Sequence, residues 1–379
     1  MPNFWPICAC RKEELLTVHQ MPHVLKEPYI HTGYRPSGQS WKYYLYSMLF
    51  LHNESVNVWT HFFGFFLILF KTIDNLSDVD ILNDKTSWPV VGYAVCCLTN
   101  LIVSTGVHLL HSKSRWHHYV FFMMDYMGVT IFCFGSGIAT MFACSTKMYF
   151  DAMFPWFLPL NVLLSWFAFF TLCMAKFCLT HQHRKKKTMM TAGVGLQITF
   201  IATPLLSRYY ECLAADSCSV WSLNHLALVL IMAVLCAITF VSKIPETWIP
   251  GRFDFFGHGH QIFHVVAVMA MLAMLRAMDI DIHVHGTMRD LEPRLGDFLL
   301  AFVALLVLEG ATLWYCIRCS VLKCEKRDDS LEMACAELAK DTPTEKKCPT
   351  ETSSNLALPK NSDEETLLRG EHGNSKKND

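Results

Sequence analysis

The chain has 379 residues, of which 52% are hydrophobic and only 17% charged, and its mean hydropathy is +0.27. This composition is too apolar for an ordinary soluble enzyme. The formal net charge is −1 at pH 7, and the basic residues cluster at the ends of apolar segments, which argues against a nucleic-acid partner.

Residues 1–55 are predicted to form a cytosolic N-terminal region with a short amphipathic helix. Apolar and aromatic side chains recur at helical spacing between residues 41 and 51, namely Trp41, Tyr44, Leu45, Met48 and Leu51. Such a helix fits either the membrane interface or a position packed against a helical bundle.

Eight apolar segments follow, each of a length suited to crossing a hydrocarbon layer of roughly 30 Å, which takes about 20 helical residues. They cover residues 56–73, 88–110, 119–144, 153–177, 189–207, 223–241, 256–278 and 298–317. The fifth is the least regular, because Pro204 and two glycines interrupt it. The sequence therefore predicts an all-α, polytopic transmembrane bundle over residues 56–318.

Lysine and arginine near the ends of these segments number fifteen on the side that includes the N-terminus and seven on the other side. Because basic residues are retained on the cytosolic side, the count predicts a cytosolic N-terminus, and eight spans return the C-terminus to the cytosol. Asn75, in a glycosylation sequon, would then face outside. Residues 319–379 are predicted to be a disordered cytosolic tail, since they are polar and almost free of aromatic residues.

Cys212 and Cys218 share the predicted external loop between the fifth and sixth segments. They are candidates for a disulfide bond, although unpaired thiols are the commoner reading of the scattered cysteines in this chain.

Ionisable groups inside the apolar segments are costly and are therefore the first candidates for function. The sequence GHGHQIFH at residues 257–264 places His260 and His264 one helical turn apart, on one face. Such a pair can share a metal ion, but it can equally form hydrogen bonds within a bundle.

His108 lies near the end of the second segment and Asp125 near the start of the third, so both should lie at the same depth as His260 and His264. Three imidazoles with an open fourth position suit zinc. Asp125 would orient or deprotonate a water there, and Ser104, one turn before His108, would assist by hydrogen bonding. The alternative is a buried Asp–His pair without metal.

Other polar residues are weaker candidates. Exposure is the expectation for His111, His117 and His118, which lie in a short turn. A structural role in capping or bracing the bundle is expected for Glu54, Asn57 and His61, whereas Glu309 in the last segment has no predicted partner.

Several motifs carry a family resemblance: GYRP at 33–36, HNESVNVWTH at 52–61, Ser104 with His108, Asp125-Tyr126, IPE at 244–246 and GHGHQIFH at 257–264. From about Tyr29 to about Asp281 the chain resembles the progestin and adipoQ receptor family. The sequence EPYI at 27–30 and the eighth span are more similar to its membrane progestin receptor branch than to its adiponectin receptor branch.

The resemblance implies a seven-helix core plus an eighth transmembrane helix, with a topology opposite to that of G-protein-coupled receptors. It implies zinc ligands at His108, His260 and His264, with Asp125 and Ser104 around the bound water. It further implies a plasma-membrane receptor for progesterone-like steroids that signals through heterotrimeric G proteins and lowers cyclic AMP.

Two functions remain open at this point. A steroid receptor would bind a rigid apolar ligand in a hydrophobic cavity between helices, among membrane lipids. A zinc-dependent lipid amide hydrolase, resembling ceramidases, would use the metal to polarise an amide carbonyl, with Asp125 as general base and Ser104 assisting.

Overall fold

The computed structural model describes residues 15–321, apart from 78, 82, 86, 179–182 and 286–293. These residues form helices and no strand, although an isolated backbone bridge joins Leu16 to Tyr34. The α-helices are α1 (Trp41–Tyr46), α2 (Ser55–Asn75), α3 (Ser87–Leu110), α4 (Arg115–Phe142), α5 (Lys147–Cys178), α6 (His183–Ala214), α7 (Asn224–Ser242), α8 (Gly259–Ile280) and α9 (Leu295–Cys316). The predicted all-α fold is confirmed, and the predicted tail from residue 322 lies outside the described residues.

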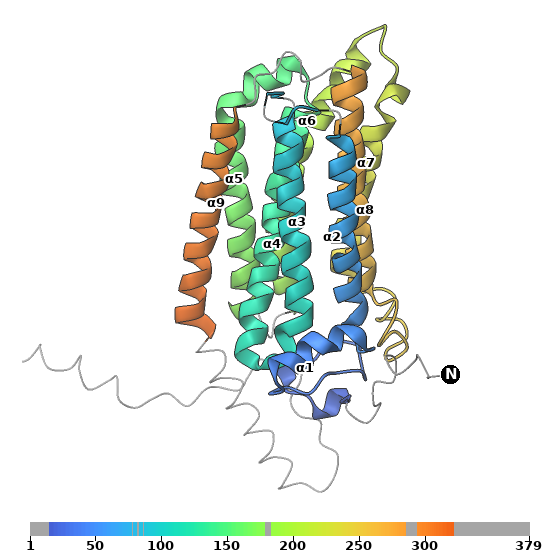
Figure 1. The fold of residues 1–379 in the computed structure, drawn as a ribbon, viewed down its shortest axis with the longest axis vertical. Coiled ribbons are helices and arrows are strands. Elements are labelled where there is room, and N and C mark those ends of the chain that lie inside the picture. Colours follow the sequence, from blue (N-terminus) through green and yellow to red (C-terminus); the bar gives the residue numbers. More distant parts are fainter. Residues whose placement is uncertain are drawn as a thin grey trace, which may run out of the picture. The chain divides into compact units, whose positions relative to one another are not determined.

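The long helices run alongside one another as a bundle (Figure 1). Within the described residues, seven helices, α2 to α7 and α9, are long and apolar enough to cross a membrane. Helix α8 matches the predicted segment at 256–278 and has 22 residues, but its polar side chains make it less apolar. It packs against α2 and α7 and buries Gln261 and His264, so its polar groups face the bundle. The protein is therefore a polytopic helical membrane protein.

Helices α5 and α6 are longer than their apolar segments predict, because polar residues extend α5 at its start and α6 at both ends. Pro155, Pro159 and Pro204 lie inside these helices and do not end them. Pro204 cannot donate to the carbonyl of Phe200, and the hydroxyl of Thr203 donates to that carbonyl at 2.7 Å. A neighbouring side chain thus satisfies the acceptor that proline leaves open, as a helix in lipid requires.

Helix α4 is the central helix, in contact with α3, α5 and α6. Gly135 of α4 lies so close to α3 that an added Cβ would come within 2.5 Å of the Cβ of Cys96. Glu309 of α9, which had no predicted partner, is fully buried and accepts a hydrogen bond of 2.6 Å from Thr130 of α4. This contact joins the outermost helix to the centre of the bundle.

Helix α1 lies at one end of the bundle, which we call the α1 end (Figure 1). It is shorter than the predicted amphipathic stretch and continues as a 3₁₀ turn at Ser47–Leu49. Tyr44 is buried and its hydroxyl donates to the carbonyl of Pro36 at 2.8 Å, whereas Trp41 and Leu45 are exposed. One face of α1 therefore packs on the bundle and the other is available to the membrane interface.

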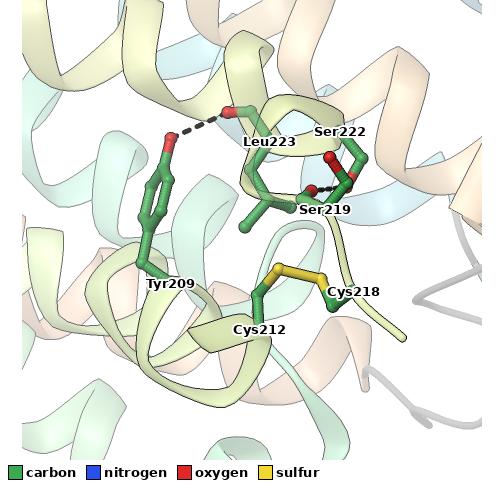
Figure 2. The surroundings of a disulfide bond; sticks show 6 residues. All are labelled: Tyr209, Cys212, Cys218, Ser219, Ser222 and Leu223. Carbon is green, nitrogen blue, oxygen red and sulfur yellow. Dashed lines mark hydrogen bonds between the residues drawn. A yellow bond between two sulfur atoms is a disulfide. The ribbon is translucent and has the colours of Figure 1, made fainter. Parts of the chain in front are cut away.

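The opposite end, which we call the disulfide end, contains the Cys212–Cys218 disulfide between the end of α6 and the loop that leads to α7 (Figure 2). Tyr209 donates to the carbonyl of Leu223 at 2.8 Å across the same loop. Beneath it, the fully buried Asp281 pairs with Arg208 of α6 at 2.6 Å and with His225 of α7 at 2.9 Å. These contacts fix the ends of α6, α7 and α8 to one another.

Candidate metal centre

Three histidines from two helices converge at the α1 end. His108 occupies the last turn of α3, and His260 and His264 occupy the first two turns of α8. One ring nitrogen of each lies within 4.8 Å of the others, so this group could hold a metal ion. His108 and His264 are buried and His260 is half-buried. The structure thus brings together the three side chains that the sequence places at a common depth.

The spacing of the ring nitrogens suits zinc. The Nε2 atoms of His108 and His260 are 3.2 Å apart, within hydrogen-bonding distance when one of them carries a proton. Two zinc–nitrogen bonds of about 2.0–2.1 Å at a tetrahedral angle would place their nitrogens about 3.3–3.4 Å apart. The donor set and its spacing therefore fit a zinc ion.

Glu54, immediately before α2, orients His108. Its Oε2 accepts from Nδ1 of His108 at 2.8 Å and from the side-chain amide of Asn57 at 2.6 Å. Burial by itself raises the pKa of Glu54, but His108 and His111 outweigh burial and hold that pKa well below its usual range. Glu54 is therefore a carboxylate that keeps the Nδ1 proton of His108 in place and leaves Nε2 for a metal.

His264 is oriented in the same way by the backbone of α2. Its Nδ1 lies 3.2 Å from the carbonyl oxygen of Asn57 and 3.3 Å from the hydroxyl of Thr60. The ring of His61 stacks on His264 with centroids 3.7 Å apart and planes 8° apart. Asn57 and His61 therefore brace the histidine cluster itself, which is more specific than the predicted bracing of the bundle.

The start of α8 is fixed by Glu246, whose Oε2 accepts from the backbone N–H of Gly259 at 2.6 Å. A carboxylate at this position accepts from a backbone N–H that the helix leaves unpaired. Its negative charge also interacts favourably with the positive N-terminal end of the helix dipole. A Cβ on Gly259 would meet the carbonyl of Ile244 at 2.9 Å, so the IPE turn and the glycine pack in direct contact. This contact fixes where α8 begins, and with it the position of His260 and His264 along the bundle.

The end of α3 is fixed by Arg35, which is buried beneath it. Its guanidinium donates to the carbonyls of His108 and Leu109 at 2.8 and 2.6 Å and to the hydroxyl of Ser47 at 2.7 Å. Burial lowers the pKa of Arg35 to about 10, so it is still charged at neutral pH. The arginine fork thus occupies carbonyls that a helix end leaves open.

Asp125 and Ser104 lie beside the cluster and outside the group of possible metal ligands. Asp125 is buried on α4, with Ser104 of α3 and His108 as its neighbours. Its Oδ1 has no hydrogen-bond partner among the described residues. The carboxylate therefore has one oxygen open to a further hydrogen-bond donor.

The expected exposure of the α3–α4 turn is wrong for two of its three histidines. His111 and His118 are buried, with their Nδ1 atoms 3.2 Å apart, and His117 is half-buried. His111 lies 3.6 Å from Glu54 and His118 lies 3.2 Å from Lys176 of α5. His111 thus lies against the residue that precedes α2, and His118 lies against α5, contacts that the short polar sequence of the turn does not reveal.

Sequence reasoning also missed Arg35 and Glu246 as parts of the site, and it did not pair Glu54 with His108. The available signal was positional, because each lies in one of the family motifs, GYRP, IPE and HNESVNVWTH. The structure explains the spacing of those motifs, since each fixes one helix end from which a histidine or its partner projects.

A substitution at Glu54 tests its positioning role. Glu54→Gln keeps the size of the side chain but removes the charge that holds the Nδ1 proton of His108. We expect zinc affinity to fall about 10- to 100-fold, as is usual when such a supporting carboxylate is lost, measured by competition with a chelator. Glu27→Gln is the matched control at the same end of the bundle; an equal loss in both variants would contradict the assignment.

Comparison with known proteins places these residues in context. Residues 49–275 match the family model described as Haemolysin-III related. The chain is 33% identical over 279 residues to membrane progestin receptor alpha-B of Danio rerio, which covers 71% of this chain and 79% of that protein. It is 32% identical over 264 residues to membrane progestin receptor beta of Homo sapiens, covering 69% and 74% of the two chains. Membrane progestin receptor alpha of Homo sapiens is 30% identical over 278 residues, covering 73% and 80%.

Proposed function

The chain belongs to the progestin and adipoQ receptor family, and from that premise we propose that it is a plasma-membrane receptor for progesterone-like steroids. The observation that carries the proposal is the similarity to proteins named membrane progestin receptors across more than two thirds of either chain. A bundle of apolar helices offers such a rigid, apolar ligand the kind of environment that it prefers.

Zinc belongs to this proposal as a resident ion held by His108, His260 and His264. When bound, it would supply a cross-link between α3 and α8 and a Lewis-acidic centre. The chain's own contribution is orientation, since Glu54 and the Asn57 carbonyl hold the two Nδ1 protons while Arg35 and Glu246 hold the helix ends.

We propose a cytosolic α1 end and an external disulfide end. The distribution of lysine and arginine supports this orientation, and so does the Cys212–Cys218 disulfide, because such bonds persist in oxidising compartments. A heterotrimeric G protein, the proposed signalling partner that lowers cyclic AMP, would then bind at the α1 end.

The orientation has a direct test. The side-chain amide of Asn75 donates to the carbonyl of Leu275 at 3.2 Å, so Asn75 is a poor acceptor for a glycan and a poor reporter. We expect an epitope tag inserted between Asp216 and Ser217 to bind antibody on intact cells, and a tag at the N-terminus to bind only after permeabilisation. The reverse pattern would invert the topology.

A second function, zinc-dependent hydrolysis of a lipid amide, has one observation in its favour. The open Oδ1 of the buried Asp125 can take a proton in the manner of a general base, and Ser104 lies beside the carboxylate. Lipid substrates would reach this site from within the membrane.

One preparation discriminates the two functions. For a receptor, purified wild type and Asp125→Asn should bind radiolabelled progesterone saturably, and neither should release sphingosine from ceramide. A hydrolase would release sphingosine, and Asp125→Asn would lower the rate about 10²- to 10⁴-fold. Folded, zinc-containing protein that binds no progestin would defeat the receptor proposal.

A further inference from the structure

A groove of about 510 Å³ lies between α5 and α9, away from the histidine cluster. Its floor is formed by Leu158 and Val162 of α5 and by Ala301 of α9, all of which are buried. Leu163 and Leu300 flank it and are exposed, 50% and 73% respectively. Because both helices are long and apolar enough to cross the membrane, the groove opens sideways to lipid.

Small and ring-shaped residues create this groove. Helix α9 places Ala301 and Ala304 opposite Pro155 and Pro159 of α5, so no long side chain fills the space. Helix α9 lies at the edge of the bundle, next to α5 (Figure 1). From Asp297 to Leu308 the groove follows twelve residues of α9, and their eleven steps span about 17 Å at 1.5 Å per residue. Its volume is within the range of about 300–1,000 Å³ that is usual for small-molecule pockets.

The groove has one charged lining residue among those described, Asp297, at the disulfide end. Its carboxylate has no hydrogen-bond or ion-pair partner within the described part of the chain, whereas Asp151 of α5 pairs with Lys147. Asp297 lies in the first turn of α9, where the helix dipole favours a negative charge. One end of an otherwise apolar groove thus presents an acceptor near the membrane surface.

We propose that this groove binds a membrane sterol with a free hydroxyl group, which donates to Asp297 while the fused rings lie along α5 and α9. A fatty acid or a phospholipid would bring an anionic group against the carboxylate, which disfavours both. A flexible alcohol lipid would lose more conformational freedom than a rigid sterol on entering the groove. Progesterone carries ketones, which only accept hydrogen bonds, so Asp297 selects against it. The sterol site is therefore separate from the proposed progestin site.

Photolabelling tests the proposal. The full-length protein, in nanodiscs of phosphatidylcholine, is labelled with a diazirine analogue of cholesterol, and labelled peptides are mapped by mass spectrometry. We expect labels on α5 between Phe154 and Leu163 and on α9 between Asp297 and Leu308. Excess cholesterol should remove these labels. Cholestenone, which has a ketone in place of the hydroxyl, should compete at least about fivefold less well, the size of effect usual for one hydrogen bond.

Two variants and a control complete the test. Ala304→Phe fills the groove and should lower labelling at least tenfold, and Asp297→Ala should abolish the preference for cholesterol over cholestenone. Val303→Phe, at the exposed neighbouring position of α9, should label like wild type. Thermal melting and progesterone binding, measured on each variant, show that the fold and the receptor function are separate from this site. Unchanged labelling of Ala304→Phe, equal competition by the ketone, or competition by phospholipid alone would overturn the proposal.

Discussion

Purified wild-type protein will contain about one zinc ion per chain, and the double variant His260→Ala/His264→Ala will contain none. The reason is geometric, because the two substitutions remove two of the three nitrogens that converge at the α1 end. His108 alone cannot hold the ion against a buffer, since structural and catalytic zinc sites use at least three protein ligands. Elemental analysis of the protein after gel filtration measures the content.

The same preparation gives a second readout, thermal stability. Zinc that binds the folded state at 100 times its dissociation constant stabilises that state by about 2.7 kcal/mol. A strong chelator should therefore lower the Tm of wild type and leave the Tm of the double variant unchanged. His283→Ala changes an exposed histidine outside the site and should retain its zinc. A metal-free wild type of unaltered stability would refute the site.

Arg35→Ala will lower the stability of the fold at the α1 end and weaken zinc binding, although Arg35 is not itself a zinc ligand. It leaves the carbonyls of His108 and Leu109 and the hydroxyls of Ser47 and Ser112 without their buried donor. Each unsatisfied buried group costs about 1–3 kcal/mol, so the total loss should be about 3 kcal/mol or more. Melting in detergent and zinc content after chelator challenge measure the two effects.

Arg35→Lys separates charge from geometry. An ammonium group keeps the charge but cannot place a planar fork between two carbonyls. We therefore expect it to recover less than half of the lost Tm. Lys42→Ala, which removes an exposed basic residue of α1, is the control. Full rescue by lysine would show that charge alone matters at this position.

The sequence by itself determined the membrane class, the number of long helices and most helix centres. This was possible because a segment of about 20 apolar residues has few alternatives to a helix in lipid. The helix ends were less predictable: α6 runs through Pro204 to Ala214, because Thr203 replaces the missing donor and polar residues continue the helix. Likewise, the sequence predicts an apolar segment over residues 256–278, whereas α8 begins only at Gly259, whose backbone N–H donates to Glu246.

For the site, the sequence determined which side chains could share a metal, because His260 and His264 are one turn apart and alternation of the spans sets the depth of His108. Only the tertiary structure decided which groups orient them. Glu54, Arg35 and Glu246 come from loops before or between the helices, and nothing local in the sequence says which helix end each will reach. Burial of His111 and His118 was likewise decided by tertiary packing, since a polar turn is exposed or covered according to what packs over it.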